Sequence, residues 1–116
     1  MPAEDGRAAR IRELNDQMRT GGPGTPSHNR WLLTSGVLAL GEDAVAAVVD
    51  GIRAFSAFTK DNDPYGEHDF GSVTVGGQNV FWKIDYYDRD LSGGSPDPAD
   101  EAVTCRVLTI MLASEY

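Results

Sequence analysis

Two adjacent glycines, Gly76 and Gly77, divide a segment of alternating β-forming residues, EHDFGSVTVGGQNVFWKIDYYD. Glycine pairs readily adopt the positive φ angles of tight hairpin turns, so this segment predicts two antiparallel strands joined by a two-residue turn. The turn also sets the register, because side chains alternate between the two faces of a strand. One face then carries Val73, Val80 and Trp82, which we expect to pack against helices. The opposite face carries both apolar and polar side chains, so we expect it to face solvent or to hold a functional site.

The rest of the chain predicts helices and one further short strand. Apolar residues recur at helical spacing in residues 8–18, in residues 42–58, and from Asp97 or Pro98 through Val103, Val107, Ile110 and Met111. The segment RWLLTS predicts a short strand. The element order is therefore α-β-α-β-β-α. This order indicates an α+β fold with a small, mainly antiparallel three-stranded sheet and helices on one face.

Length and composition indicate one domain over residues 1–116, with residues 1–7 flexible and residues 20–29 forming a loop rich in Gly and Pro. The amino-terminal residues are charged where a signal peptide has its apolar core, and no stretch is apolar enough to span a bilayer. The single cysteine, Cys105, suits a reducing compartment. The expected localisation is cytoplasmic, away from the membrane.

The formal net charge is −8, and the acidic residues are concentrated between residues 60 and 101, where ten acids face three bases. Phosphate neutralisation needs clustered Lys and Arg, so direct nucleic-acid binding is not expected. An acidic surface suits a basic protein partner or cations, although it also simply keeps a small protein soluble.

The densest acidic segment is KDNDPYGEHDFG, residues 60–71. Its spacing begins like an EF-hand loop but fails where Tyr65 and Ser72 replace ligands. A looser divalent cation site could use Asp61, Asp63 and Asp69. The simpler interpretation is that Asp61 and Asn62 cap the preceding turn and that Asp63-Pro64 starts the next one, and no cofactor is expected. The three soft or imidazole ligands, His28, His68 and Cys105, lack the spacing of a zinc site.

A catalytic alternative follows from the hairpin register, which places His68 opposite Asp85. A carboxylate in that position would orient the imidazole as a general base, with Lys83 on the same face to bind an anion. The sequence marks no nucleophile beside this pair, and such pairs also form simply to satisfy buried polar groups.

The segment FWKIDYYD interleaves four aromatic residues with charges. Aromatic side chains on an acidic surface are typical of protein interfaces, where they act as anchors. The residues predicted to contact a partner are Asp61, Asp63, Tyr65, Glu67, Asp69, Phe81, Tyr87, Asp88 and Asp90.

Four segments together resemble a known family: IRELNDQMR, FTKDNDPYGEHDFG, VFWKIDYYD and SPDPADEAVTCRVLTIMLASEY. They are similar to an uncharacterised family of small bacterial proteins, the domain-of-unknown-function family number 3768. The resemblance runs from about Ile11 to Tyr116, and residues 61–70 all match its signature. The resemblance implies that the gene often lies on a plasmid or another mobile element. It implies no activity, because none is established for the family.

Two functions are therefore predicted. The first is a non-catalytic protein-binding or inhibitory module, such as a mobile-element accessory that counters a basic nucleic-acid-binding or defence factor of the host. The alternative is a small hydrolase or transferase that uses His68 and Asp85, with or without a divalent cation.

Overall fold

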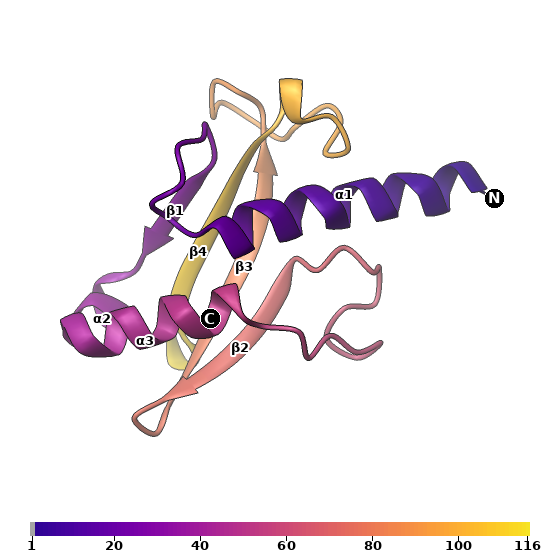
Figure 1. The fold of residues 1–116 in the computed structure, drawn as a ribbon. Coiled ribbons are helices and arrows are strands. Elements are labelled where there is room, and N and C mark those ends of the chain that lie inside the picture. The colour runs from indigo at the N-terminus through magenta and orange to yellow at the C-terminus, as the bar shows by residue number, and fades with distance from the viewer. Residues whose placement is uncertain (1) are drawn as a thin grey trace.

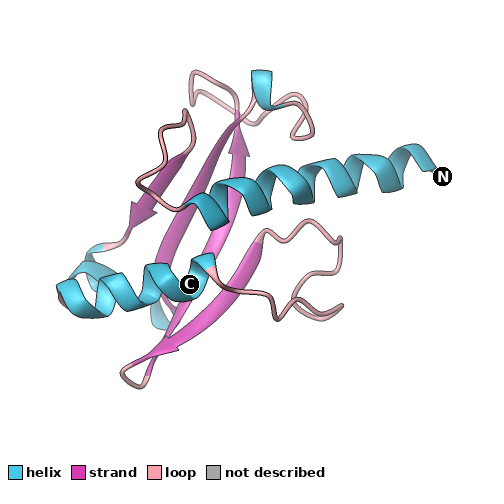
Figure 2. Ribbon diagram, viewed as in Figure 1, coloured by secondary structure: helices cyan, strands magenta, loops and turns pink. Residues whose placement is uncertain are grey.

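A computed structural model describes residues 2–116, with side chains described from Gly6 onward. Three helices and four strands follow one another along the chain, with two short 3₁₀ turns (Figures 1 and 2). They are α1 (Pro2–Gly21), β1 (Arg30–Leu33), α2 (Ser35–Leu38), α3 (Glu42–Arg53), β2 (Phe70–Val75), β3 (Gln78–Tyr87), η1 (Glu101–Val103), β4 (Cys105–Leu112) and η2 (Ala113–Glu115). The α+β class is confirmed. Helix α1 starts inside residues 1–7, whose predicted flexibility stays a prediction.

The strands form one mixed sheet in the order β1-β4-β3-β2. Strand β1 pairs with β4 in parallel, whereas the β3–β4 and β2–β3 pairs are antiparallel. The predicted sheet was three-stranded and mainly antiparallel. Its strand count is wrong, because β4 is a fourth strand, whereas two of the three observed strand pairs are antiparallel.

The hairpin register is confirmed over the whole of β2. Val75 lies opposite Gln78, Val73 opposite Val80, and Gly71 opposite Trp82. Both turn glycines have positive φ angles, 58° at Gly76 and 80° at Gly77, as a two-residue hairpin turn requires.

The last predicted helix is instead β4, the strand between β1 and β3. Its residues are buried on both faces, so its apolar run lacks the alternation that identifies a half-buried strand. Helical spacing of Val107, Ile110 and Met111 is then a coincidence within a nearly continuous apolar run. Of the helix predicted to start at Asp97 or Pro98, only the short 3₁₀ turn η1 is present. There the Asp100 side chain accepts a hydrogen bond from the Ala102 N–H.

Helices α1 and α3 lie across one face of the sheet (Figure 1). The core forms there and centres on Trp82, Leu108 and Ile110, all fully buried. Helix α3 ends at Arg53, five residues earlier than predicted, and Phe55 and Phe58 reach Trp82 from the extended chain beyond it.

Two glycines allow close packing in this layer. A Cβ atom on Gly51 of α3 would lie 3.2 Å from Val73, so this glycine lets α3 pack closely on β2. A Cβ atom on Gly71 would lie 2.7 Å from the Trp82 ring. Gly71 thus provides the space that the largest core side chain occupies.

The opposite face of the sheet carries no helix of the described residues except the C-terminal turn η2. Tyr116, just after that turn, packs its ring on Phe70 and Phe81 at centroid distances of 5.8 and 5.5 Å. Beside them, a groove on this side is lined by residues that include Arg30, Leu32, Lys83, Asp85, Tyr87 and Leu91, and we call these six residues the open face.

Candidate functional site

The acidic segment of residues 60–71 is a tightly bonded loop that leads from α3 to β2. Asn62 closes its first turn, since its side chain accepts a hydrogen bond from the Thr59 N–H and donates to the Ala57 carbonyl. Asp63 is buried and accepts from the backbone N–H of His68 at 3.0 Å. These contacts match the turn-capping interpretation of the loop.

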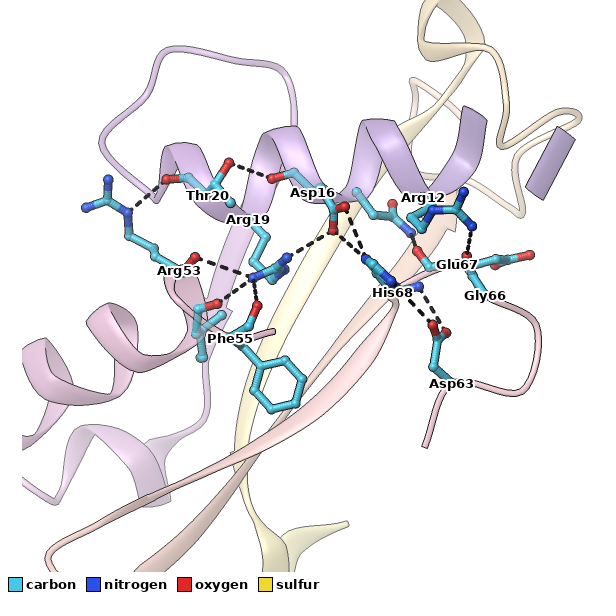
Figure 3. A network of polar contacts seen from close by, with 12 residues as sticks. Arg12, Asp16, Arg19, Thr20, Arg53, Phe55, Asp63, Gly66, Glu67 and His68 are labelled. Carbon is cyan, nitrogen blue, oxygen red and sulfur yellow. Dashed lines mark hydrogen bonds and ion pairs between the residues drawn. The ribbon is translucent and has the colours of Figure 1, made fainter. Parts of the chain in front are cut away.

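His68 is the centre of a contact network between this loop and α1 (Figure 3). Its Nδ1 lies 2.9 Å from an Asp16 carboxylate oxygen, and its Nε2 lies 3.7 Å from Asp63. The ring stacks on Phe58 at a centroid distance of 3.7 Å and an interplanar angle of 3°. The side chain is 24% exposed. These contacts orient the imidazole and cover one of its faces.

The predicted pair of His68 and Asp85 does not form. His68 has a φ angle of 56°, which turns the chain out of the strand two residues before β2 begins. Its side chain therefore points to α1 on the helix side of the sheet, while Asp85 lies on the open face. Asp85 instead forms an ion pair with Lys83, whose Nζ lies 2.9 Å from a carboxylate oxygen of Asp85.

Helix α1 supplies polar partners that the sequence analysis missed. Arg19 is 3% exposed and donates to the carbonyls of Ile52 and Phe55, both at 2.9 Å. It also pairs with Asp16 at 2.9 Å, so Asp16 lies between Arg19 and His68 (Figure 3). The available signal was spacing, because positions 15 and 19 adjoin the apolar stripe of this helix.

A second branch of the network runs under α1 to β4. Asn15 is fully buried and donates to the Glu67 carbonyl at 2.9 Å and to the Tyr86 hydroxyl at 2.8 Å. Tyr86 donates in turn to the Glu67 carboxylate at 2.8 Å. Burial raises the pKa of Tyr86 far above its usual range, so the phenol remains a neutral donor. The side chain of Asn15 also accepts from Arg106 Nε at 2.6 Å.

The residues proposed as cation ligands differ in their surroundings. Asp61 is exposed, Asp63 is buried against His68, and Asp69 is partly buried. Within residues 6–116, no group of three or more His, Cys, Asp or Glu side chains is arranged to hold a metal ion.

The predicted partner-contacting residues divide between two places. Those from Asp61 to Asp69 belong to the bonded loop, where only Asp61 and Tyr65 are exposed. Tyr87 belongs to the open face, and Asp88 and Asp90 follow it in the adjoining turn. Phe81 lies partly buried under Tyr116. The predicted set is therefore two surfaces rather than one.

The open face combines apolar and charged side chains around a shallow groove of about 410 Å³. Leu32 is 51% exposed, Leu91 40% and Tyr87 37%. At the end of β3, Asp88 accepts hydrogen bonds from the backbone N–H and hydroxyl of Ser92, which lower the pKa of its carboxyl group. These bonds favour the ionised form of Asp88, which follows Tyr87 in the chain.

Comparison with protein families places this chain. The model described as "Protein of unknown function (DUF3768)" matches residues 33–115, which includes α2, α3, β2, β3, β4 and only the last residue of β1. The chain belongs to this family. No curated protein and no solved structure matches it. Among the described residues, no helix has the length and apolar character needed to cross a membrane.

Proposed function

We propose that this family member is a non-catalytic protein-binding module that binds its partner on the open face. The observation that carries the proposal is the exposure of Leu32, Tyr87 and Leu91 together around one groove. Neighbouring apolar side chains left exposed on a small domain are typical of interaction sites, and tyrosine is enriched among the residues that dominate binding.

The charge of the chain supports a basic partner. The net charge is −8, and Asp88 and Asp90 follow Tyr87 in the chain, while the charged residues that line the groove itself are Arg30, Lys83 and Asp85. A basic protein that presents an apolar side chain would be attracted to this acidic chain at a distance and would fill the groove with that side chain. Proteins that bind nucleic acids carry such basic surfaces. In its more specific form, the proposal is that this protein inhibits a nucleic-acid-binding protein or acts as its accessory.

Site-specific photo-crosslinking tests the proposal. A photo-reactive amino acid at position 87 should give a discrete adduct with a basic protein, and raised salt or Leu91→Ser should weaken it. The matched control is position 65, where Tyr65 is 79% exposed on the distant loop. Equal adducts from both positions, no adduct from position 87, or an adduct only with a second copy of this chain would contradict the proposal.

One observation favours the catalytic alternative, a small hydrolase or transferase. The hydrogen bond of His68 Nδ1 to Asp16 is the arrangement that orients a general base, with Asp16 in place of Asp85. The stacked Phe58 ring and the nearby Asp63 also suit a structural role. Loss of a measured hydrolytic activity in His68→Asn, with an unchanged melting temperature, would favour the enzyme.

A further inference from the structure

A second cavity, of about 300 Å³, lies on the helix side of the sheet. It is lined by the second half of α1, the loop of residues 22–29, the start of β1 and η1, and it is open to solvent on one side. Leu14, Met18 and Trp31 give it apolar walls, and Gln17, Ser27 and Arg106 are among its polar lining. Polar groups make up more of this lining than apolar ones, and the volume lies at the lower end of the range of small-molecule sites.

Arg106 is the unusual member of this lining. Its side chain is 1% exposed, yet among residues 6–116 no carboxylate forms an ion pair with it. Nε donates to Asn15, Nη2 donates to the Pro98 carbonyl, and the guanidinium carbon lies 5.2 Å from the centre of the Tyr86 ring. All three partners are neutral.

The third guanidinium nitrogen, Nη1, has no hydrogen-bond partner within the described part of the chain. A buried cation with no direct ion-pair partner is costly to a fold. Burial lowers the pKa of Arg106, and the nearby Tyr86, Glu101 and Glu67 only oppose that shift. An anion that enters the cavity would complete the hydrogen bonds of this group and neutralise its charge.

We propose that the cavity binds a small organic monocarboxylate. Its carboxylate accepts hydrogen bonds from Arg106, and its apolar body packs on Trp31, Leu14 and Met18. A single negative charge suits the site better than a phosphate dianion, because the lining holds one cation, Arg106, and one acid, Glu101. The site is separate from the open face and does not depend on the proposed partner.

Titration of the full chain, followed by NMR at the Trp31 indole N–H, tests this inference. Benzoate is the probe, benzamide is its uncharged counterpart, and inorganic phosphate is the competing anion. Benzoate should shift the Trp31 resonance saturably, while benzamide and phosphate should not. Because charge-assisted hydrogen bonds are strong, Arg106→Gln should weaken benzoate binding by about tenfold or more.

A second variant retains Arg106 in case its replacement unfolds the protein. Gln17 lines the cavity from an exposed position of α1, so Gln17→Phe should block entry without loss of folding. Glu13→Phe, one turn earlier on the same helix and outside the cavity, should bind benzoate normally. The inference is overturned if benzoate gives no saturable shift, if benzamide or phosphate binds equally well, or if binding survives in Gln17→Phe.

Discussion

The Asp69 carboxyl group shows how the acidic loop is balanced against the sheet. The backbone carbonyl of Asp69 accepts a hydrogen bond from the Ile84 N–H at 2.9 Å. This bond holds Asp69 beside β3, although β2 starts only at the next residue. Burial, followed by the nearby charge of Glu67, raises the pKa of Asp69. An ionised Asp69 therefore destabilises the fold at neutral pH.

We expect Asp69→Asn to raise the melting temperature at pH 7. The folded pKa lies above the unfolded value of about 3.8, so the wild-type residue stabilises the fold below that pH and loses this contribution as pH rises. The gain from the substitution should thus vanish in acid. Melting curves between pH 3 and pH 8 measure it, with the exposed Asp61→Asn as control. A gain that grows in acid would contradict the assignment.

The contact of His68 with Asp16 is expected to stabilise the fold. His68→Ala should lower the free energy of unfolding by about 1–3 kcal/mol, because it removes a hydrogen bond and the stacked contact with Phe58. Asp16→Ala should also destabilise the fold. The double variant should lose less free energy of unfolding than the sum of the two single losses.

Denaturant titration of these variants gives the coupling energy. Asp85→Ala is the matched control, since it breaks an ion pair with Lys83 whose side chains are both 39% exposed, and such pairs contribute about 0–1 kcal/mol. Additive effects of His68→Ala with Asp16→Ala, or coupling of His68 to Asp85, would disprove the pairing described above.

At the scale of elements, the sequence predicts structure that neighbouring residues determine, but not contacts between residues far apart in the chain. The Gly76-Gly77 turn sets the hairpin register within a few residues, so the sequence was sufficient there. Strand β4 was mistaken for a helix because burial on both faces removes the period of two from its sequence. The partner of His68 lies 52 residues away on α1, and no sequence spacing reports that contact.

The hairpin turn should tolerate asparagine in place of its first glycine. Both turn residues have positive φ, which Asn adopts more easily than other non-glycine residues. Gly76→Asn should therefore stabilise by about 0.4–1 kcal/mol through reduced freedom of the unfolded chain, while Gly76→Val should destabilise. Thermal unfolding of the two variants measures this, and equal melting temperatures would contradict the turn geometry.

Replacement of Gly71 in strand β2 should destabilise the fold much more than replacement of Gly76 by asparagine. A methyl group there would lie 2.7 Å from the Trp82 ring, so Gly71→Ala should cost about 1–3 kcal/mol of stability. Gly24→Ala is the control, because a Cβ atom at position 24 has no neighbour within 4 Å. Equal unfolding midpoints in denaturant for the two variants would show that the ring can move aside.

The whole molecule carries its charge unevenly, with a −7 excess between residues 60 and 101. Self-repulsion destabilises a compact acidic chain, and salt screens it over about 10 Å at 0.1 M. The melting temperature at pH 7 should accordingly rise when NaCl is added to a low-salt buffer. Calcium or magnesium at matched ionic strength should add nothing beyond screening. A larger rise with either divalent ion would instead favour a cation site at Asp61, Asp63 and Asp69.

The central position of β4 also has a consequence for biosynthesis. Strand β1 is made early, but its only partner in the sheet is β4, which leaves the ribosome some seventy residues later. Nascent chains that stop before Cys105 hold the hairpin and α3, yet leave one edge of β3 and all of β1 without hydrogen bonds. The fold therefore closes in a late step, and translation that ends prematurely yields fragments with open strand edges rather than smaller stable domains.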